Sequence, residues 1–384
     1  MTTWLPRWIA LLVLVLQFVP VVAALDDTEI ARLIKHLGQD DFDKREAAAT
    51  RLKEIGEPAL DALCKAAIGG DAEARGRAKK IIVVIEQKLY REQLRFTSHT
   101  DEVWSISVSR DGQRVLTASS DKTLRLWDAH TGKQQRVFEG HTGAITEAAL
   151  SADGKRVLSG SADGTVRLWD LTTGEELRQM TGRATEVCGV AFGPDGTAIS
   201  GGSDGNVYLW DLNTSKNLGV FAGHIPWVRN VAYSDQAKLA ATCGQDQSIR
   251  LWNLETGKEI RKLPTGKTGR HIDMAVCFSP DGKRLLLAGV DMSLRILDVA
   301  TGKELMQIKN ANAFCAAFSP DGKRIVSGGC FDYIVRVWDA ATGKELRNYE
   351  GHTACVTSVT FFPDGQRIAS ASVDGTARIW RAPR

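Results

Sequence analysis

The feature that most constrains this chain of 384 residues is a unit of about 42 residues that occurs seven times. Each unit contains a Trp-Asp pair or a variant of that pair, and an Asp lies six residues before it. A period of this length indicates one supersecondary unit that buries its apolar surface against its neighbours. The pairs are Trp127-Asp128, Trp169-Asp170, Trp210-Asp211, Trp252-Asn253, Leu297-Asp298, Trp338-Asp339 and Trp380-Arg381.

Turn signals recur with the same period. Most units carry an Asp-Gly turn, such as Asp153-Gly154, and a Thr-Gly turn, such as Thr173-Gly174. Short segments of alternating polarity, for example residues 166–169, lie between these turns and indicate strands. Four strands per unit predict an all-β seven-bladed propeller with four-stranded antiparallel blades, which a short all-α helical segment precedes.

These repeats resemble the WD-repeat β-propeller family from residue 92 to residue 384. The Gly-His half of the family signature is present at Gly140-His141, Gly223-His224 and Gly351-His352, with Ser98-His99 as a variant. The resemblance implies a buried tetrad of His, Ser or Thr, Asp and Trp in each blade. It is complete in four blades, as His99, Thr117, Asp121 and Trp127; His141, Ser159, Asp163 and Trp169; His224, Thr242, Asp246 and Trp252; and His352, Ser370, Asp374 and Trp380.

The tetrad has a physical reason, because a buried indole N–H needs an acceptor and a buried imidazole needs a carboxylate. Three blades depart from it. In blade three Arg183 replaces the His beside Ser200, Asp204 and Trp210; in blade five Leu287 and Leu297 leave Asp291 without its partners; in blade six Ser327, Asp332 and Trp338 have no evident His. His271 is an uncertain candidate for blade five.

The last repeat ends at Arg384, directly after its third strand. Residues 93–96 align with the fourth strands of other repeats, so we expect this segment to complete the last blade and remove two free sheet edges. Residues 25–91 have a helical apolar period with Gly38, Gly56 and Gly69 as stops, which predicts four short helices. They resemble HEAT-type repeats, and a plain helical bundle is the alternative.

Residues 1–24 have the pattern of a signal peptide. A charge-free apolar block follows Arg7, and Val22-Ala23-Ala24 supplies small residues for cleavage. The alternative is an uncleaved membrane anchor, although Pro20 interrupts the run. Either interpretation places the rest of the chain outside the cytoplasm, as a periplasmic, cell-surface or secreted protein whose only membrane contact is an uncleaved N-terminus.

Composition excludes several classes of function. The net charge of +3 mixes both signs, which argues against a nucleic-acid binder. The seven cysteines are irregularly spaced without a CxxC pair, so we expect small buried residues rather than disulfides or a metal site. Apparent matches to GxSxG around Ser203 and to a phosphate loop at Lys267 lack the helix that each motif requires. We therefore predict no catalytic residue, no cofactor and no metal.

The sequence thus predicts a non-enzymatic scaffold, a monomer or part of a hetero-complex, that binds protein or peptide partners. An enzyme or small-ligand receptor that uses the channel mouth is the alternative. In this architecture, the third and fifth residues after the tetrad His, and the residue before the tetrad Asp, lie at the top rim of the channel. The predicted partner-binding residues are Glu102, Trp104, Glu186, Trp227, Arg229, Gln245, Met274, Phe314 and Phe331. Trp and Arg dominate interface hot spots, although Trp104 and Trp227 would also suit packing between blades.

Overall fold

The computed structural model describes residues 27–69, 71–264, 273–289 and 291–383. It divides into two compact units, one up to Leu89 and one from Tyr90 onward, which we describe separately. The predicted signal peptide lies outside the described residues. Within the described part of the chain, no helix is both long enough and apolar enough to span a bilayer.

The N-terminal unit is helical, as the apolar period predicts. It contains α1 (Asp27–His36), α2 (Phe42–Ile55), a short 3₁₀ turn (Glu57–Ala59), α3 (Leu60–Ile68) and α4 (Ala72–Leu89). Asp41 caps α2, because its side chain accepts a hydrogen bond from the backbone N–H of Lys44. Leu37, Leu52 and Leu63 are fully buried, so the apolar faces of these helices form one core.

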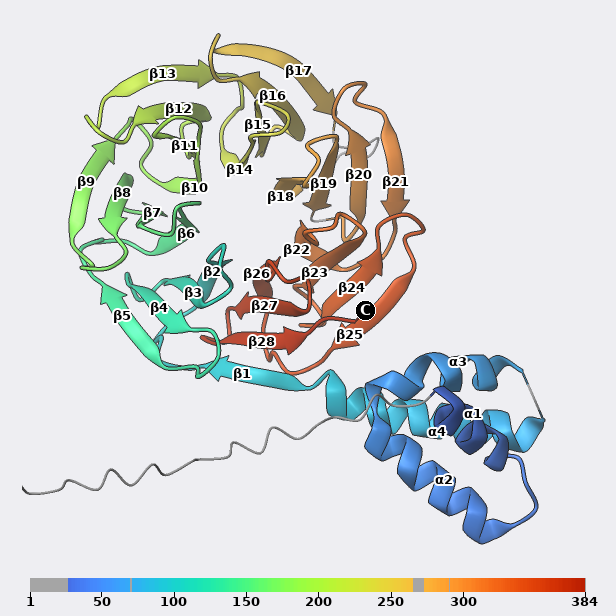
Figure 1. The fold of residues 1–384 in the computed structure, drawn as a ribbon. Coiled ribbons are helices and arrows are strands. Elements are labelled where there is room, and N and C mark those ends of the chain that lie inside the picture. Colours follow the sequence, from blue (N-terminus) through green and yellow to red (C-terminus); the bar gives the residue numbers. More distant parts are fainter. Residues whose placement is uncertain (1–26, 70, 265–272, 290, 384) are drawn as a thin grey trace, which may run out of the picture. The chain divides into compact units, whose positions relative to one another are not determined.

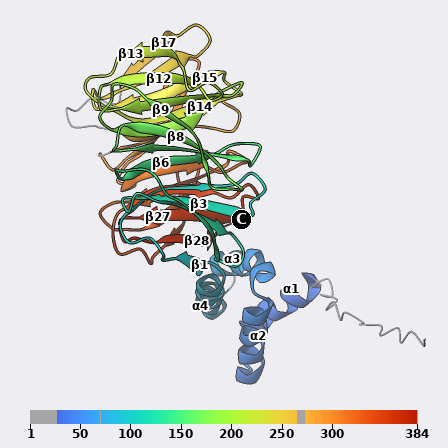
Figure 2. The same ribbon diagram turned by 90° about the vertical axis from the view of Figure 1, so that its left-hand side faces the viewer.

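The second unit is a seven-bladed propeller of four-stranded antiparallel blades, which confirms the predicted fold (Figure 1). Figure 2 views it from the side. The strands of blades one to three are β2 (Val103–Val108), β3 (Arg114–Ser119), β4 (Leu124–Asp128) and β5 (Gln134–Phe138); β6 (Ile145–Leu150), β7 (Arg156–Ser161), β8 (Thr165–Asp170) and β9 (Glu176–Thr181); β10 (Val187–Phe192), β11 (Thr197–Gly202), β12 (Asn206–Asp211) and β13 (Asn217–Ala222). Those of blades four and five are β14 (Val228–Ser234), β15 (Leu239–Gly244), β16 (Ser248–Asn253) and β17 (Lys258–Pro264); β18 (Asp273–Phe278), β19 (Arg284–Gly289), β20 (Leu294–Asp298) and β21 (Glu304–Ile308). Those of blades six and seven are β22 (Ala313–Phe318), β23 (Arg324–Gly329), β24 (Val335–Asp339) and β25 (Glu345–Tyr349); β26 (Val356–Phe361), β27 (Arg367–Ser372), β28 (Ala377–Arg381) and β1 (Glu92–Phe96).

The ring closes as expected from the sequence. β1 pairs antiparallel with β28, and Phe96 is the partner of Ala377. The N-terminal strand of the propeller is therefore the outermost strand of its last blade, and this pairing removes two free edges.

Each blade buries both of its faces against its neighbours. The clusters of buried side chains combine residues of adjacent blades; one joins Leu124 and Phe138 of blade one to Ile145 and Trp169 of blade two. The second strand of every blade is nearly all buried, whereas the outermost strands are largely exposed. The buried second strands therefore support the innermost strands, which surround the central channel (Figure 1).

The expectation that the cysteines are unpaired is wrong for two of them. Cys330 and Cys355 form a disulfide between blades six and seven. Spacing along the chain does not reveal this pair, because the propeller brings together the loop after β23 and the loop before β26. Cys64 is exposed, and only Cys243 and Cys315 are buried as free thiols.

Candidate functional site

Four blades contain the hydrogen-bonded tetrad. In blade two, His141 Nδ1 lies 2.8 Å from Asp163, His141 Nε2 lies 2.8 Å from Ser159, and Trp169 donates to Ser159 at 2.9 Å. The same bonds join the corresponding residues of blades one, four and seven, at 2.7–2.9 Å. Each tetrad ties the loop that enters the innermost strand to the second and third strands of its blade. It therefore fixes the loops of one face.

The tetrad groups are held in defined protonation states. Burial opposes the ionisation of Asp163, yet hydrogen bonds from Thr165, Thr142 and His141 outweigh it and hold the pKa of this carboxyl well below its usual range. Burial lowers the pKa of His141, His224 and His352, against the opposing effect of their Asp partners. In blades two, four and seven, the tetrads are thus neutral imidazoles on ionised carboxylates at neutral pH, which is a structural arrangement.

The three incomplete blades replace the missing His in different ways. In blade three, Trp210 donates to Ser200, and the Tyr208 hydroxyl donates to Asp204 at 2.5 Å. In blade six, Trp338 donates to Ser327, and Arg336 pairs with Asp332. In blade five, Leu287 and Leu297 pack in an apolar cluster, while Asp291 binds Ser293 and the buried Arg295. His271 lies outside the described residues.

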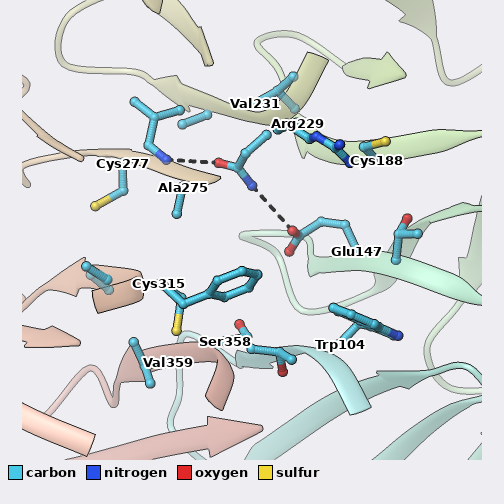
Figure 3. A pocket seen from close by; sticks show the side chains of 18 of the residues that line it. Trp104, Glu147, Cys188, Arg229, Val231, Ala275, Cys277, Cys315, Ser358 and Val359 are labelled. Atoms are coloured by element: carbon cyan, nitrogen blue, oxygen red, sulfur yellow. Dashed lines mark hydrogen bonds between the residues drawn. The ribbon is translucent and has the colours of Figure 1, made fainter. Parts of the chain in front are cut away.

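The face fixed by the tetrads is called the top face here. It comprises the loops that enter the innermost strands and the turns between the second and third strands. Backbone hydrogen bonds join the two sets, for example from Ser120 to Glu102 and from Gln245 to Trp227. A cavity of about 490 Å³ occupies the central channel, and all seven innermost strands line it (Figure 3).

Five of the predicted rim residues line this cavity, namely Trp104, Glu186, Trp227, Arg229 and Phe314. Trp104 donates from its indole to the Ser120 hydroxyl at 2.8 Å. The guanidinium of Arg229 lies 4.6 Å from the ring centroid of Trp227, a cation–π contact that fixes both side chains. Both Trp residues therefore line the channel cavity, where Trp104 is held by its hydrogen bond and Trp227 by its cation–π contact.

The other four predicted residues lie elsewhere. Glu102 and Gln245 are half-buried in the joined top-face loops and do not line the cavity. Phe331 is 69% exposed and borders a separate apolar cavity of about 110 Å³ with Met292 and Cys330. Met274 lies in β18, and its side chain is outside the described part of the structure.

The sequence analysis missed Glu147, whose side chain faces the channel from β6 (Figure 3). Every innermost strand has a register shift between its first and third residues, where it pairs with the second strand of its blade. Such a β-bulge changes which of the following side chains point towards the channel. The sixth residue after the tetrad His therefore reaches the channel as well. Applied to His141, that position is Glu147.

Three cysteine thiols line the channel, and their raised pKa values make them poor nucleophiles. Burial raises the pKa of Cys188 to about 11 and that of Cys277 to about 12, and it raises the pKa of Cys315 further. A protonated thiol is a poor nucleophile and a poor metal ligand. Among the described residues, no three His, Cys, Asp or Glu side chains gather in a way that suits a metal ion.

The fold and its tetrads define a seven-bladed β-propeller built from repeats of one kind. The sequence model "WD domain, G-beta repeat" matches residues 90–128, 132–170, 174–211, 303–339 and 343–381, about half of the chain. The model "Anaphase-promoting complex subunit 4 WD40 domain" matches residues 231–319. The chain belongs to the WD40-repeat family.

Curated relatives match shorter stretches. A serine-threonine kinase receptor-associated protein of Gallus gallus is 28% identical over 136 residues, which are 35% of this chain and 37% of the relative. A guanine nucleotide-binding protein subunit beta of Oryza sativa subsp. japonica is 29% identical over 151 residues, 38% of this chain and 29% of the relative. The nuclear distribution protein PAC1 of Arthroderma benhamiae is 29% identical over 142 residues, 37% of this chain and 23% of the relative. The chain thus matches about a third or less of the length of these relatives.

Proposed function

We propose that this chain is a non-enzymatic scaffold that binds a protein or peptide partner at the top-face mouth of the channel. The observation that carries the proposal is that Trp104, Trp227 and Arg229 all line the same channel cavity with held side chains, Trp104 by its hydrogen bond to Ser120 and the other two by their cation–π contact. Trp and Arg residues in fixed positions are typical of interface hot spots. Phe331 and Ile225, which are 69% and 77% exposed, add apolar surface in the top-face loops.

The comparisons support a scaffold rather than an enzyme. Two relatives are, by name, a receptor-associated protein and a subunit of a larger protein. The protonated thiols of the channel argue against a cysteine nucleophile. We therefore propose association with other proteins as the activity of this propeller.

The mouth is tested with the double variant Trp227→Ala, Arg229→Glu. Proteins that co-purify with the tagged wild-type chain from the secreted and envelope fractions of the source cells are identified by mass spectrometry. The variant should lose them while it keeps the wild-type circular dichroism spectrum and melting temperature. The matched control is Ile260→Ala, Lys258→Glu on the exposed outer strand β17, which makes the same kinds of change away from the mouth. Retention of the same partners by the folded mouth variant would show that the site is wrong.

We further propose that the protein is exported. The signal-peptide pattern of residues 1–24 supports this, and so does the disulfide between Cys330 and Cys355, because disulfides persist in oxidising compartments. Intact-mass analysis of secreted protein should find an N-terminus near Leu25. Full-length protein that only detergent extracts would favour an anchor, and full-length protein in the cytosol would contradict export.

A further inference from the structure

One level of the channel has a single carboxylate side chain. The residue that follows the bulge occupies the same register position in all seven innermost strands. These residues are Ser105, Glu147, Gly189, Asn230, Ala275, Cys315 and Ser358. Six of the seven are small or uncharged, so Glu147 alone brings a carboxylate to this level of the cavity.

Among the described residues, the side chains that bind this carboxylate are both neutral. The Ser105 hydroxyl donates to Oε1 at 2.9 Å. From across the channel, Asn230 Nδ2 donates to Oε2 at 3.4 Å, and Figure 3 draws this bond to Glu147. Asn230 is oriented by the backbone N–H of Val276, which donates to its Oδ1 at 3.3 Å. The amide therefore presents its NH₂ group to Glu147.

The contrast with the tetrads is direct. Asp163 has Arg167 within 3.7 Å in addition to its His, whereas no ion pair to Glu147 occurs among the described residues. Burial raises the pKa of Glu147 to about 7. A carboxylate inside a protein without a counter-charge is costly, and a bound cation would remove that cost.

We propose that the upper channel binds an organic cation, a primary ammonium or guanidinium group, with the Glu147 carboxylate as its counter-ion. The cavity of about 490 Å³ admits an alkyl ammonium group with water around it, and Trp104 and Phe314 are among the residues that line it. Aromatic faces and one carboxylate suit an organic cation. Hard metal ions need more oxygen ligands than this level offers.

The cation that binds is either a free small amine or a Lys or Arg side chain that a partner inserts through the mouth. The inference goes beyond the proposed scaffold, because a free amine needs no protein partner. Other charged or titratable groups face the cavity from neighbouring strands: Arg229, Glu186, Cys188, Cys277 and Cys315. Arg229 stacks on Trp227. Its positive charge acts to lower the pKa of Cys188, against the larger effect of burial.

The test uses titration calorimetry on the full mature chain. The probes are n-butylamine and agmatine, with n-butanol as a neutral isostere, and the peptide acetyl-Gly-Lys-Gly-amide, with norleucine in place of Lys as its control. We expect dissociation constants on the order of 1 mM for the amines, since one charged contact supports binding. Glu147→Gln should weaken binding by about tenfold or more. The control Glu175→Gln changes an exposed carboxylate that does not line the cavity and should weaken binding by less than about threefold.

Wild-type protein provides a second measurement that is independent of any variant. Binding should strengthen from pH 6 to pH 8, because Glu147 ionises in this window while the amines stay protonated. The thiols of Cys188 and Cys277, with pKa values of about 11 and 12, do not ionise there.

Each outcome decides the proposal. Binding of the free amines identifies a small-molecule site, whereas binding of the Lys peptide alone identifies a partner side chain as the source. Equal binding of butylamine and butanol, equal binding by wild type and Glu147→Gln, or no binding of any probe would overturn the proposal. If Glu147→Gln does not fold, the wild-type pH series decides. These calorimetric measurements do not use capture of a protein partner. If the mouth variant keeps the partners of the wild type, that result contradicts the proposed scaffold function and leaves this inference untouched.

Discussion

The hydroxyl of Tyr208 donates to Asp204 at 2.5 Å and accepts the backbone N–H of Arg183 at 3.1 Å. In the complete blades, an imidazole makes the corresponding contact with the carboxylate. Tyr208 lies two residues before Trp210 and stacks on its ring at 5.5 Å. Blade three thus joins its entry loop to its third strand through a phenol rather than an imidazole, and it keeps the Asp in place.

Tyr208→Phe should lower the free energy of unfolding by about 1–2 kcal/mol, because Asp204 and the Arg183 N–H each lose a hydrogen-bond partner in a largely buried site. The ring and its stacking on Trp210 are retained. Urea unfolding measures the loss. Tyr333→Phe, in an exposed residue, is the matched control. Equal stability of Tyr208→Phe and wild type would show that this phenol does not replace the histidine.

Asp291 offers a different test, because its partner is a charge. Asp291→Ala removes the carboxylate 2.8 Å from the buried Arg295, while that of Glu304 stays 3.9 Å away, so it should destabilise the protein by about 3 kcal/mol. Adding Arg295→Met should restore most of this loss, since an apolar side chain suits that buried position. Melting temperature and urea unfolding measure both variants.

The matched experiment in blade two should not show this rescue. Asp163→Ala leaves His141, Thr165 and the Thr142 N–H without their acceptor, at a cost of about 1–3 kcal/mol. Adding Arg167→Met does not replace those contacts. Rescue in both blades, or in neither, would contradict the different roles assigned to the two carboxylates.

Stability should depend on pH through the tetrads and Glu147 with opposite signs. Burial lowers the pKa of His141, His224 and His352 below 6.5, so the unfolded chain binds more protons and stability falls as the pH drops from 7 to 5. The pKa of Glu147 is about 7 in the folded chain and 4.5 in the unfolded chain. Its contribution to the stability of the folded chain therefore increases as the pH drops over the same range. Each group contributes at most about 1.4 kcal/mol per pH unit.

The two contributions are separated by variants. As the pH drops from 7 to 5, the free energy of unfolding should change more unfavourably in Glu147→Gln than in wild type, and less unfavourably in His141→Gln than in wild type. The slope is measured by urea unfolding between pH 5 and pH 7.5, with His130→Gln in an exposed loop as the substitution control. A steeper slope in His141→Gln than in wild type would show that the assigned sign is wrong.

The sequence predicts the propeller well because the repeat period, the turns and the tetrad residues are all local patterns. The completion of the last blade by β1 follows from the same alignment of repeats. Glu147 shows where prediction becomes difficult. A bulge in each innermost strand adds one residue, so simple alternation along β6 misses Glu147, whereas a fixed offset from the histidine finds rim residues such as Trp104.

Contacts between blades are harder still to predict. Asn230 and Glu147 are 83 residues apart in sequence and meet across the channel. Cys330 and Cys355 are paired because ring geometry brings together loops of adjacent blades. No spacing rule within one repeat contains this information, and it requires the three-dimensional ring.

The disulfide between Cys330 and Cys355 provides the last prediction. Unfolded protein under non-reducing conditions should expose five thiols to a thiol reagent, and seven after reduction, because five cysteines are free. Cys330→Ser with Cys355→Ser should destabilise the chain by about 2–4 kcal/mol, since the bond closes a loop between residues 25 apart in sequence. Cys243→Ser, at a buried free thiol, is the control and should change the non-reduced count by one thiol only. Seven reactive thiols in non-reduced, secreted protein would contradict the disulfide and weaken the argument for export.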